Sequence, residues 1–135
     1  PILTIEDIKN FKENVYLQNA VNRAFVRFLR FVGLRKKPWH EQEIKEIEQA
    51  YKLSIKVEDY YIEKDPNNWE SRKSLWLFPN HNWLRITRVI ASLVLLEMQE
   101  EADTLLSCIT KLYNEGCGSP ESFKYWQKAV EGKIT

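Results

Sequence analysis

Polar side chains recur at helical spacing near the middle of the chain. The spacing of i, i+4, i+7 and i+11 places four of them on one edge of a helix: His81, Arg85, Arg88 and Ser92. Guanidinium groups bind carboxylates and phosphates through paired hydrogen bonds, and a helix N-terminus favours the same anions. His81, Asn82 and Arg85 stand where this helix would begin, with Arg88 behind them. The pattern predicts an anion or peptide site at that end of the helix.

The same arginines also have a structural interpretation. Apolar residues cover most sides of the predicted helix: Trp83, Leu84, Ile86, Val89, Ile90, Ala91, Leu93, Val94, Leu95 and Leu96. Such a helix is typical of the centre of a core, where an arginine must be paired because an unpaired buried charge is costly. The candidate partners are the acids just before it: Glu58, Asp59, Glu63 and Asp65. In this interpretation His81 and Asn82 cap the helix, and Arg88 and Ser92 fasten it inside the core.

A second basic stripe lies nearer the beginning of the chain. Arg23, Arg27 and Arg30 share a face of a predicted helix over residues 15–32. Residues 1–39 carry eight lysines and arginines against three acids, whereas residues 40–71 carry four against nine. The stripe therefore predicts a solvated face that is neutralised by the acidic segment. The alternative is contact with nucleic acid or phospholipid.

The elements that must position these residues are helices. Apolar periodicity and capping residues predict helices over residues 5–13, 15–32, 41–53, 82–97, 101–115 and 120–131. Thr4 is placed to begin the first of these helices, with Asp7 three residues on as a capping box. Gly33 is placed to end the second, and Ser119-Pro120 to begin the last. Residues 34–38 are predicted as a basic turn and 60–79 as short helical turns at most, with Trp69, Trp76 and Phe78 folded onto the core. Residues 54–57 are either a short strand or a continued helix.

These elements predict one domain over residues 1–135. The fold class is all-α, an irregular bundle of five to six helices around a buried central helix at about residues 82–97. No heptad pattern is sustained, which excludes a strict coiled coil. The net charge is +1, so the chain as a whole does not attract nucleic acid or membranes.

Motifs for cofactors, metals and catalysis are missing from the sequence. The two cysteines, Cys108 and Cys117, form neither a CxxC nor a Cys/His cluster, so we expect no metal and no cofactor. They favour a reduced protein inside the cell, in the cytoplasm or, in a eukaryote, the nucleus. No apolar run predicts a membrane span, and no signal peptide is evident. The chain begins at Pro1, which indicates either a removed methionine or a fragment.

The run His81-Asn82-Trp83-Leu84-Arg85-Ile86-Thr87-Arg88-Val89-Ile90-Ala91-Ser92-Leu93 resembles the signature of the opioid growth factor receptor family. Three flanking segments are similar to the family in the same order: Pro1–Thr4, Ala24–Leu34 and Ser122–Val130. The segment from Lys36 to Ser74 does not share the likeness. The resemblance implies a small stand-alone helical domain of this family. Vertebrate members are described as binding an enkephalin peptide and acting in growth control at the nucleus.

Together the residues and the resemblance predict a non-enzymatic binding or interaction domain. Its binding residues would be His81, Asn82, Arg85 and Arg88, and its ligand a peptide, a protein or a small anion. The alternative is an enzyme in which His81 acts as acid or base and Arg85 holds an anionic substrate. A nucleic-acid partner would bind instead through Arg23, Arg27 and Arg30.

Overall fold

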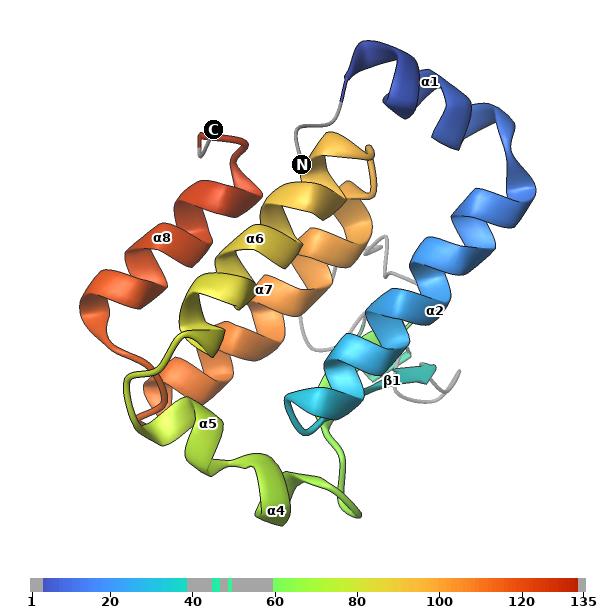
Figure 1. The fold of residues 1–135 in the computed structure, drawn as a ribbon. Coiled ribbons are helices and arrows are strands. Elements are labelled where there is room, and N and C mark those ends of the chain that lie inside the picture. Colours follow the sequence, from blue (N-terminus) through green and yellow to red (C-terminus); the bar gives the residue numbers. More distant parts are fainter. Residues whose placement is uncertain (1–3, 39–44, 47–48, 50–59, 134–135) are drawn as a thin grey trace.

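Helices form most of the computed structural model, which describes residues 4–38, 45–46, 49 and 60–133. The chain begins with α1 (Ile5–Glu13) and α2 (Val15–Phe31), followed by β1 (Leu34–Pro38) and β2 (Tyr60–Lys64). Two short helices, α4 (Trp69–Arg72) and α5 (Ser74–Leu77), lead into the last three elements: α6 (Asn82–Leu95), α7 (Gln99–Asn114) and α8 (Pro120–Val130). In Figure 1 the ribbon colour follows these elements along the chain, from blue at α1 to red at α8.

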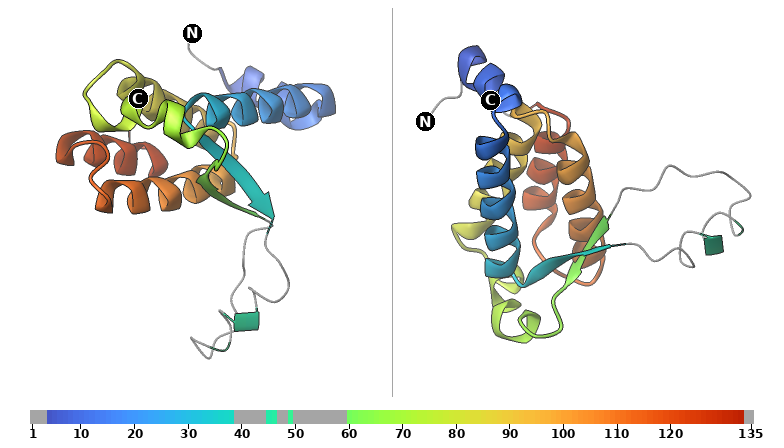
Figure 2. Two further views of the ribbon diagram at one scale, coloured as in Figure 1. Left: turned by 90° about the horizontal axis from the view of Figure 1, so that it is seen from below. Right: turned by 90° about the vertical axis from the view of Figure 1, so that its right-hand side faces the viewer.

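The last three helices pack against one another, and α2 lies along one side of them. α6, α7 and α8 contact each other pairwise, while α2 contacts α1 and β1. Figure 1 and Figure 2 show α2 running beside this three-helix unit, with α4 and α5 crossing below it. α2 and α6 therefore face each other without being neighbours in sequence.

The predicted capping residues act at the helix ends. Thr4 Oγ1 accepts a hydrogen bond from the Asp7 backbone N–H, and the Asp7 carboxylate accepts one from the Thr4 N–H, which lowers the pKa of Asp7. Gly33 takes a φ of 81° just after α2, and Ser119 Oγ accepts from the Ser122 N–H at the start of α8. The helices over 5–13, 15–32 and 120–131 are confirmed to within one or two residues.

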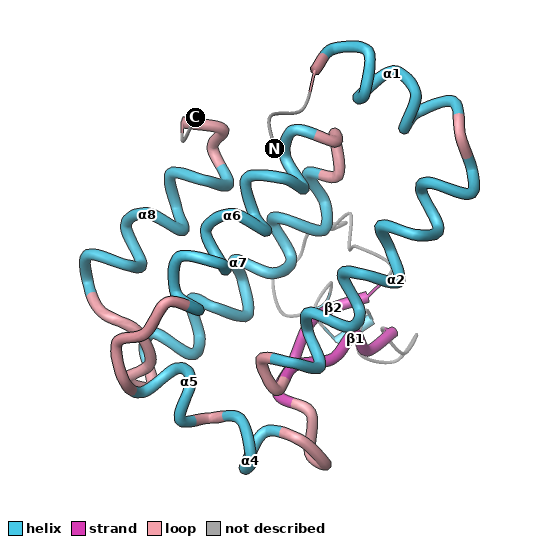
Figure 3. The backbone as a smooth tube through the Cα atoms, in the orientation of Figure 1, coloured by secondary structure: helices cyan, strands magenta, loops and turns pink. Residues whose placement is uncertain are grey.

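A small sheet corrects the all-α prediction. β1 pairs antiparallel with β2, in a register that runs from Leu34 opposite Lys64 to Pro38 opposite Tyr60. Leu34 and Ile62 are buried in the core, whereas the three basic residues of β1 are only partly covered and Pro38 is exposed. The turn expected at 34–38 is therefore wrong, because strand pairing with a distant segment decided the structure there. Figure 3 shows the two strands beside α2. The helix predicted over 41–53 and the segment 54–57 lie outside the fully described residues.

Three tryptophans join the elements at the centre of the core. The Trp126 ring contacts those of Trp76 and Trp83 edge-on, with ring centroids 5.9 and 6.4 Å apart. Each indole N–H donates to a backbone carbonyl: Trp76 to Val32 at 2.7 Å, Trp83 to Leu75 at 2.8 Å, and Trp126 to Trp83 at 3.0 Å. These bonds connect the end of α2, α5, α6 and α8, and they satisfy the indole donors of all three core tryptophans.

The central helix is less buried than its apolar composition predicts. α6 buries Trp83, Ile86, Thr87, Ile90 and Leu93, but Leu84 and Leu95 are 54% and 50% exposed. The prediction of a helix buried on nearly every side is therefore wrong. The reason is that α7 and α8 cover one side only. Phe78 is also 65% exposed, which corrects its expected place on the core, whereas Trp76 is buried as expected.

Candidate functional site

Asn80, and not His81 or Asn82, holds the beginning of α6. Its Oδ1 accepts from the Asn82 backbone N–H at 2.9 Å, and its Nδ2 donates to the carbonyls of Leu75 at 2.8 Å and Phe78 at 2.6 Å. His81 takes the N-cap position without a capping bond from its side chain. The capping role predicted for His81 and Asn82 is therefore wrong. The sequence signal for this arrangement was Asn80 itself, because an asparagine just before a helix often accepts a hydrogen bond from the backbone N–H two residues on.

The arginines of α6 lie at the surface. Arg85 and Arg88 are both exposed, and neither forms an ion pair with any residue in the described part of the chain. Arg85 Nη1 donates to Asn82 Oδ1 at 3.3 Å. The internal fastening predicted for Arg88 and Ser92 is wrong, since both side chains are outside the core.

The acids expected to pair with these arginines act elsewhere. Glu63 Oε1 accepts from Arg35 Nη2 at 3.1 Å across the sheet, and Asp65 Oδ1 accepts from the Asn67 backbone N–H at 2.9 Å. The other two candidates, Glu58 and Asp59, lie outside the described residues.

A groove between α2 and α6 brings residues of the two basic stripes together. Its wider part, of about 460 Å³, is lined by Ala24, Arg27, Phe28, Phe31, Arg85, Arg88 and Val89. Its narrower part, of about 230 Å³, is lined by Val21, Ala24, Phe25, Phe28, Arg88, Val89, Ser92, Leu93 and Leu96. The two parts share Ala24, Phe28, Arg88 and Val89, so they form one hollow, which we call the α2–α6 groove. Its floor is apolar and its wider part is edged by arginines.

The charge around the groove has a single sign. Neither α2 nor α6 contains an aspartate or a glutamate, but together they carry five arginines: Arg23, Arg27, Arg30, Arg85 and Arg88. None of these five forms an ion pair with another described residue. Arg72 adds a further cation nearby, since its guanidinium lies 5.4 Å from the centre of the Phe31 ring. The groove therefore lies in a positive field that favours an anion.

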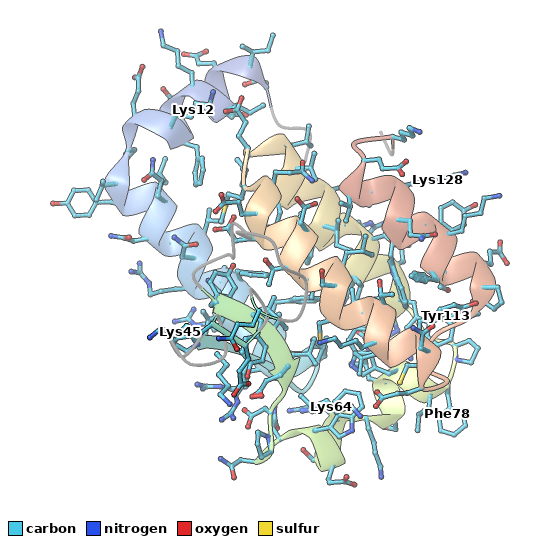
Figure 4. All side chains as sticks on the ribbon, turned by 180° about the vertical axis from the view of Figure 1, so that it is seen from behind. Lys12, Lys45, Lys64, Phe78, Tyr113 and Lys128 are labelled. Atoms are coloured by element: carbon cyan, nitrogen blue, oxygen red, sulfur yellow. The ribbon has the colours of Figure 1, made fainter. Side chains whose placement is uncertain are left out.

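A second hollow, between α6 and α8, differs in its charge. It is lined by Pro79, Asn80, Trp83, Leu84, Thr87, Ser122, Tyr125, Lys128 and Lys133. Lys133 pairs with Glu131 at 3.2 Å, whereas Lys128 lies 5.8 Å from the centre of the Tyr125 ring and forms no ion pair with a described residue. Figure 4, a view of the molecule from behind, labels Lys128 on α8 and Phe78 just ahead of α6. Among the described residues, three arginines without an ion pair line the α2–α6 groove, against one lysine without an ion pair in this second hollow.

Groups for acid–base or metal chemistry do not gather at the groove. His81 lines neither part of it, which separates this residue from the Arg88 end of the predicted site. Cys108 is buried, and burial raises the pKa of its thiol to about 12, so it is not a nucleophile at neutral pH. Within the described ranges no cluster of His, Cys, Asp or Glu could hold a metal ion, and no helix could cross a membrane.

Sequence reasoning found the two arginine stripes but missed the groove that joins them. Arg85 and Arg88 were predicted as binding residues, and Arg27 was assigned to a separate basic face. The apolar floor, made by residues such as Ala24 and Val89, was not predicted. The complete lack of acids on both helices was the available signal.

No family model, no curated protein and no solved structure matches this chain. The resemblance of residues 81–93 to the opioid growth factor receptor family therefore stays a prediction.

Proposed function

We propose that this chain is a non-enzymatic binding module that takes an anionic partner in the α2–α6 groove. The observation that carries the proposal is the meeting of Arg27, Arg85 and Arg88 at one apolar hollow, on two helices without a single acid. Arginine binds carboxylates and phosphates with charge-assisted, bidentate hydrogen bonds. A ligand would supply the negative charge that the described part of the chain does not place there.

The apolar floor supports a peptide or protein segment over a free small anion. Phosphate would use the arginines but leave Ala24, Phe28 and Val89 in water. A peptide with carboxylates and apolar side chains would use both, and burial of apolar area contributes about 25 cal/mol per Å². The family resemblance agrees with peptide binding, and the two free thiols fit an intracellular location.

The geometry gives no support to the enzymatic alternative. That alternative needs His81 beside an anion held by Arg85, and His81 lies outside both parts of the groove. Its ring also makes no capping bond at the start of α6, and it is not oriented by a hydrogen bond to another described residue.

The proposal is tested by titrating the protein with hexaglutamate and with inorganic phosphate. The test variant is Arg27→Gln/Arg85→Gln/Arg88→Gln. The control, Lys9→Gln/Lys111→Gln/Lys124→Gln, removes the same charge from exposed lysines outside the groove. We expect hexaglutamate to raise the melting temperature of the wild type and the control, while the groove variant loses about tenfold or more in affinity.

Equal binding by both triple variants would contradict the proposal, because it would assign binding to net charge alone. A single-stranded oligonucleotide serves as a further probe. If it binds more tightly than hexaglutamate, and if Arg23→Gln/Arg30→Gln abolishes that binding, the basic face of α2 is a nucleic-acid site instead.

A further inference from the structure

We infer that the occupant of the α2–α6 groove is an amphipathic helix of about three turns with acidic residues on both sides of its apolar stripe. This inference rests on the proposed function and specifies the partner. It follows from the length of the groove, the shape of its floor, the placement of its charges and the chemistry of its walls.

The length of the groove suits a short helix. On α2 its lining runs from Val21 to Phe31, and on α6 from Arg85 to Leu96. At 1.5 Å per residue both walls are about 15 Å long, which equals about three turns of a partner helix. Val21 and Leu96 line the same part, as Phe31 and Arg85 line the other, so the walls run antiparallel. Figure 1 shows the same opposed directions.

Two small side chains lie where the two parts of the groove meet, which leaves room for a bulky side chain of the partner. Ala24 and Val89 line both parts of the groove, and they are the smallest apolar side chains shared by the two. Phe28 also lines both parts. A helix whose apolar residues recur at i, i+3 or i+4 and i+7 would place one of them over Ala24 and the others on either side.

The charges stand on both walls of the wider part. Arg27 belongs to α2, whereas Arg85 and Arg88 are one turn apart on α6. A helix lying between them presents two flanks, and a carboxylate on each flank would meet an arginine. Charge complementarity therefore requires acids on both sides of the apolar stripe, near one end of the helix.

The walls disfavour an extended peptide. Both are α-helices whose backbone groups are bonded internally, so neither offers a free strand edge. An extended segment would gain no backbone hydrogen bonds from these walls, whereas a helix forms its own before it packs its apolar stripe onto the floor. An acyl chain fits poorly as well, because the groove is open to solvent and would cover it on one side only.

The experiment compares two stapled helical peptides of about 11 residues, which is about three turns. One carries leucines in a stripe flanked by glutamates, and the other is an isomer with the same residues distributed around the helix. The groove is filled by Ala24→Trp, and Asn19→Trp is the matched control on another exposed face of α2. Affinities are measured by calorimetry, and circular dichroism verifies that both variants are folded.

We expect the wild type and Asn19→Trp to bind the amphipathic peptide about tenfold or more tightly than its isomer. Ala24→Trp should lose this preference, because the indole would occupy the space of the apolar stripe. If both peptides bind the wild type equally and the arginine triple variant abolishes binding, the anion site stands and the helical occupant is refuted. If neither peptide nor hexaglutamate binds, the proposed function fails too. The comparison of peptides on the wild type decides the matter even if Ala24→Trp does not fold.

Discussion

The two sides of α6 use their polar groups in opposite ways. On the side facing α8, the indoles of Trp83 and Trp126 each donate to a backbone carbonyl, and both rings are buried. On the side facing α2, Arg85 and Arg88 are exposed and form no ion pair with a described residue. On the first side these indole donors are satisfied by carbonyl groups of the chain itself. The second retains capacity for another molecule, which is where a binding site is expected.

The packed side should carry most of the stability, and Trp126→Ala gives the largest expected effect. The residue is 1% exposed and touches both other tryptophans of the core. Truncation would leave a cavity and lower the free energy of unfolding by about 3–5 kcal/mol. Urea unfolding measures it, with the half-exposed neighbour Tyr125→Ala as a control expected to cost about 1 kcal/mol or less. Similar losses of unfolding free energy for the two variants would contradict the expectation that the buried position contributes more to stability than the exposed one.

Alkaline pH offers an intermediate test of the packed side. Burial raises the pKa of Cys108 from 9.0 to about 12. Between these values the unfolded chain has released the thiol proton and the folded chain has not, so stability falls as pH rises. The loss reaches about 2 kcal/mol near pH 10.5, and below about pH 9 it is absent. Urea unfolding of the wild type and Cys108→Ala at both pH values should show a smaller pH slope in the variant; equal slopes would mean that the thiol titrates normally.

The groove side should contribute least to stability. Arg27→Gln/Arg85→Gln/Arg88→Gln is expected to change the free energy of unfolding by about 1 kcal/mol or less, since exposed charges without partners stabilise little. A slight gain is possible from reduced repulsion among like charges. The same urea measurement applies. A loss of about 3–5 kcal/mol would show that these arginines are buried and paired, and would remove the contrast between the two sides.

Local signals in the sequence were sufficient for the helices. The caps at Thr4, Asn14, Gly33 and Ser119 each act within a few residues, so their effects could be predicted without knowledge of the fold. The arginines at 85 and 88 were likewise recognised as one stripe from their spacing.

Features that depend on distant segments were missed. β1 is a strand because residues Leu34 to Pro38 pair with residues Tyr60 to Lys64. The sequence of β1 does not alternate between polar and apolar residues, so it does not by itself predict a strand. Leu84 and Leu95 are exposed because no described helix covers that side of α6, although their type predicts burial. The groove is missed for the same reason, since it exists only where α2 and α6 face each other.

The uneven anchoring of α2 affects how the groove can respond. Phe25 and Leu29 are buried in its second half, whereas Val15 and Tyr16 at its beginning are 63% and 84% exposed. Local opening therefore costs less free energy at the first turns than at the last, so backbone amide protons should exchange with solvent along a gradient. Of the groove residues on α2, Val21 is nearest the weakly held beginning, whereas Phe25 and Phe28 lie in the firmly held half. We therefore expect faster amide exchange at Val21 than at Phe28, and the groove to open first at its Val21 end.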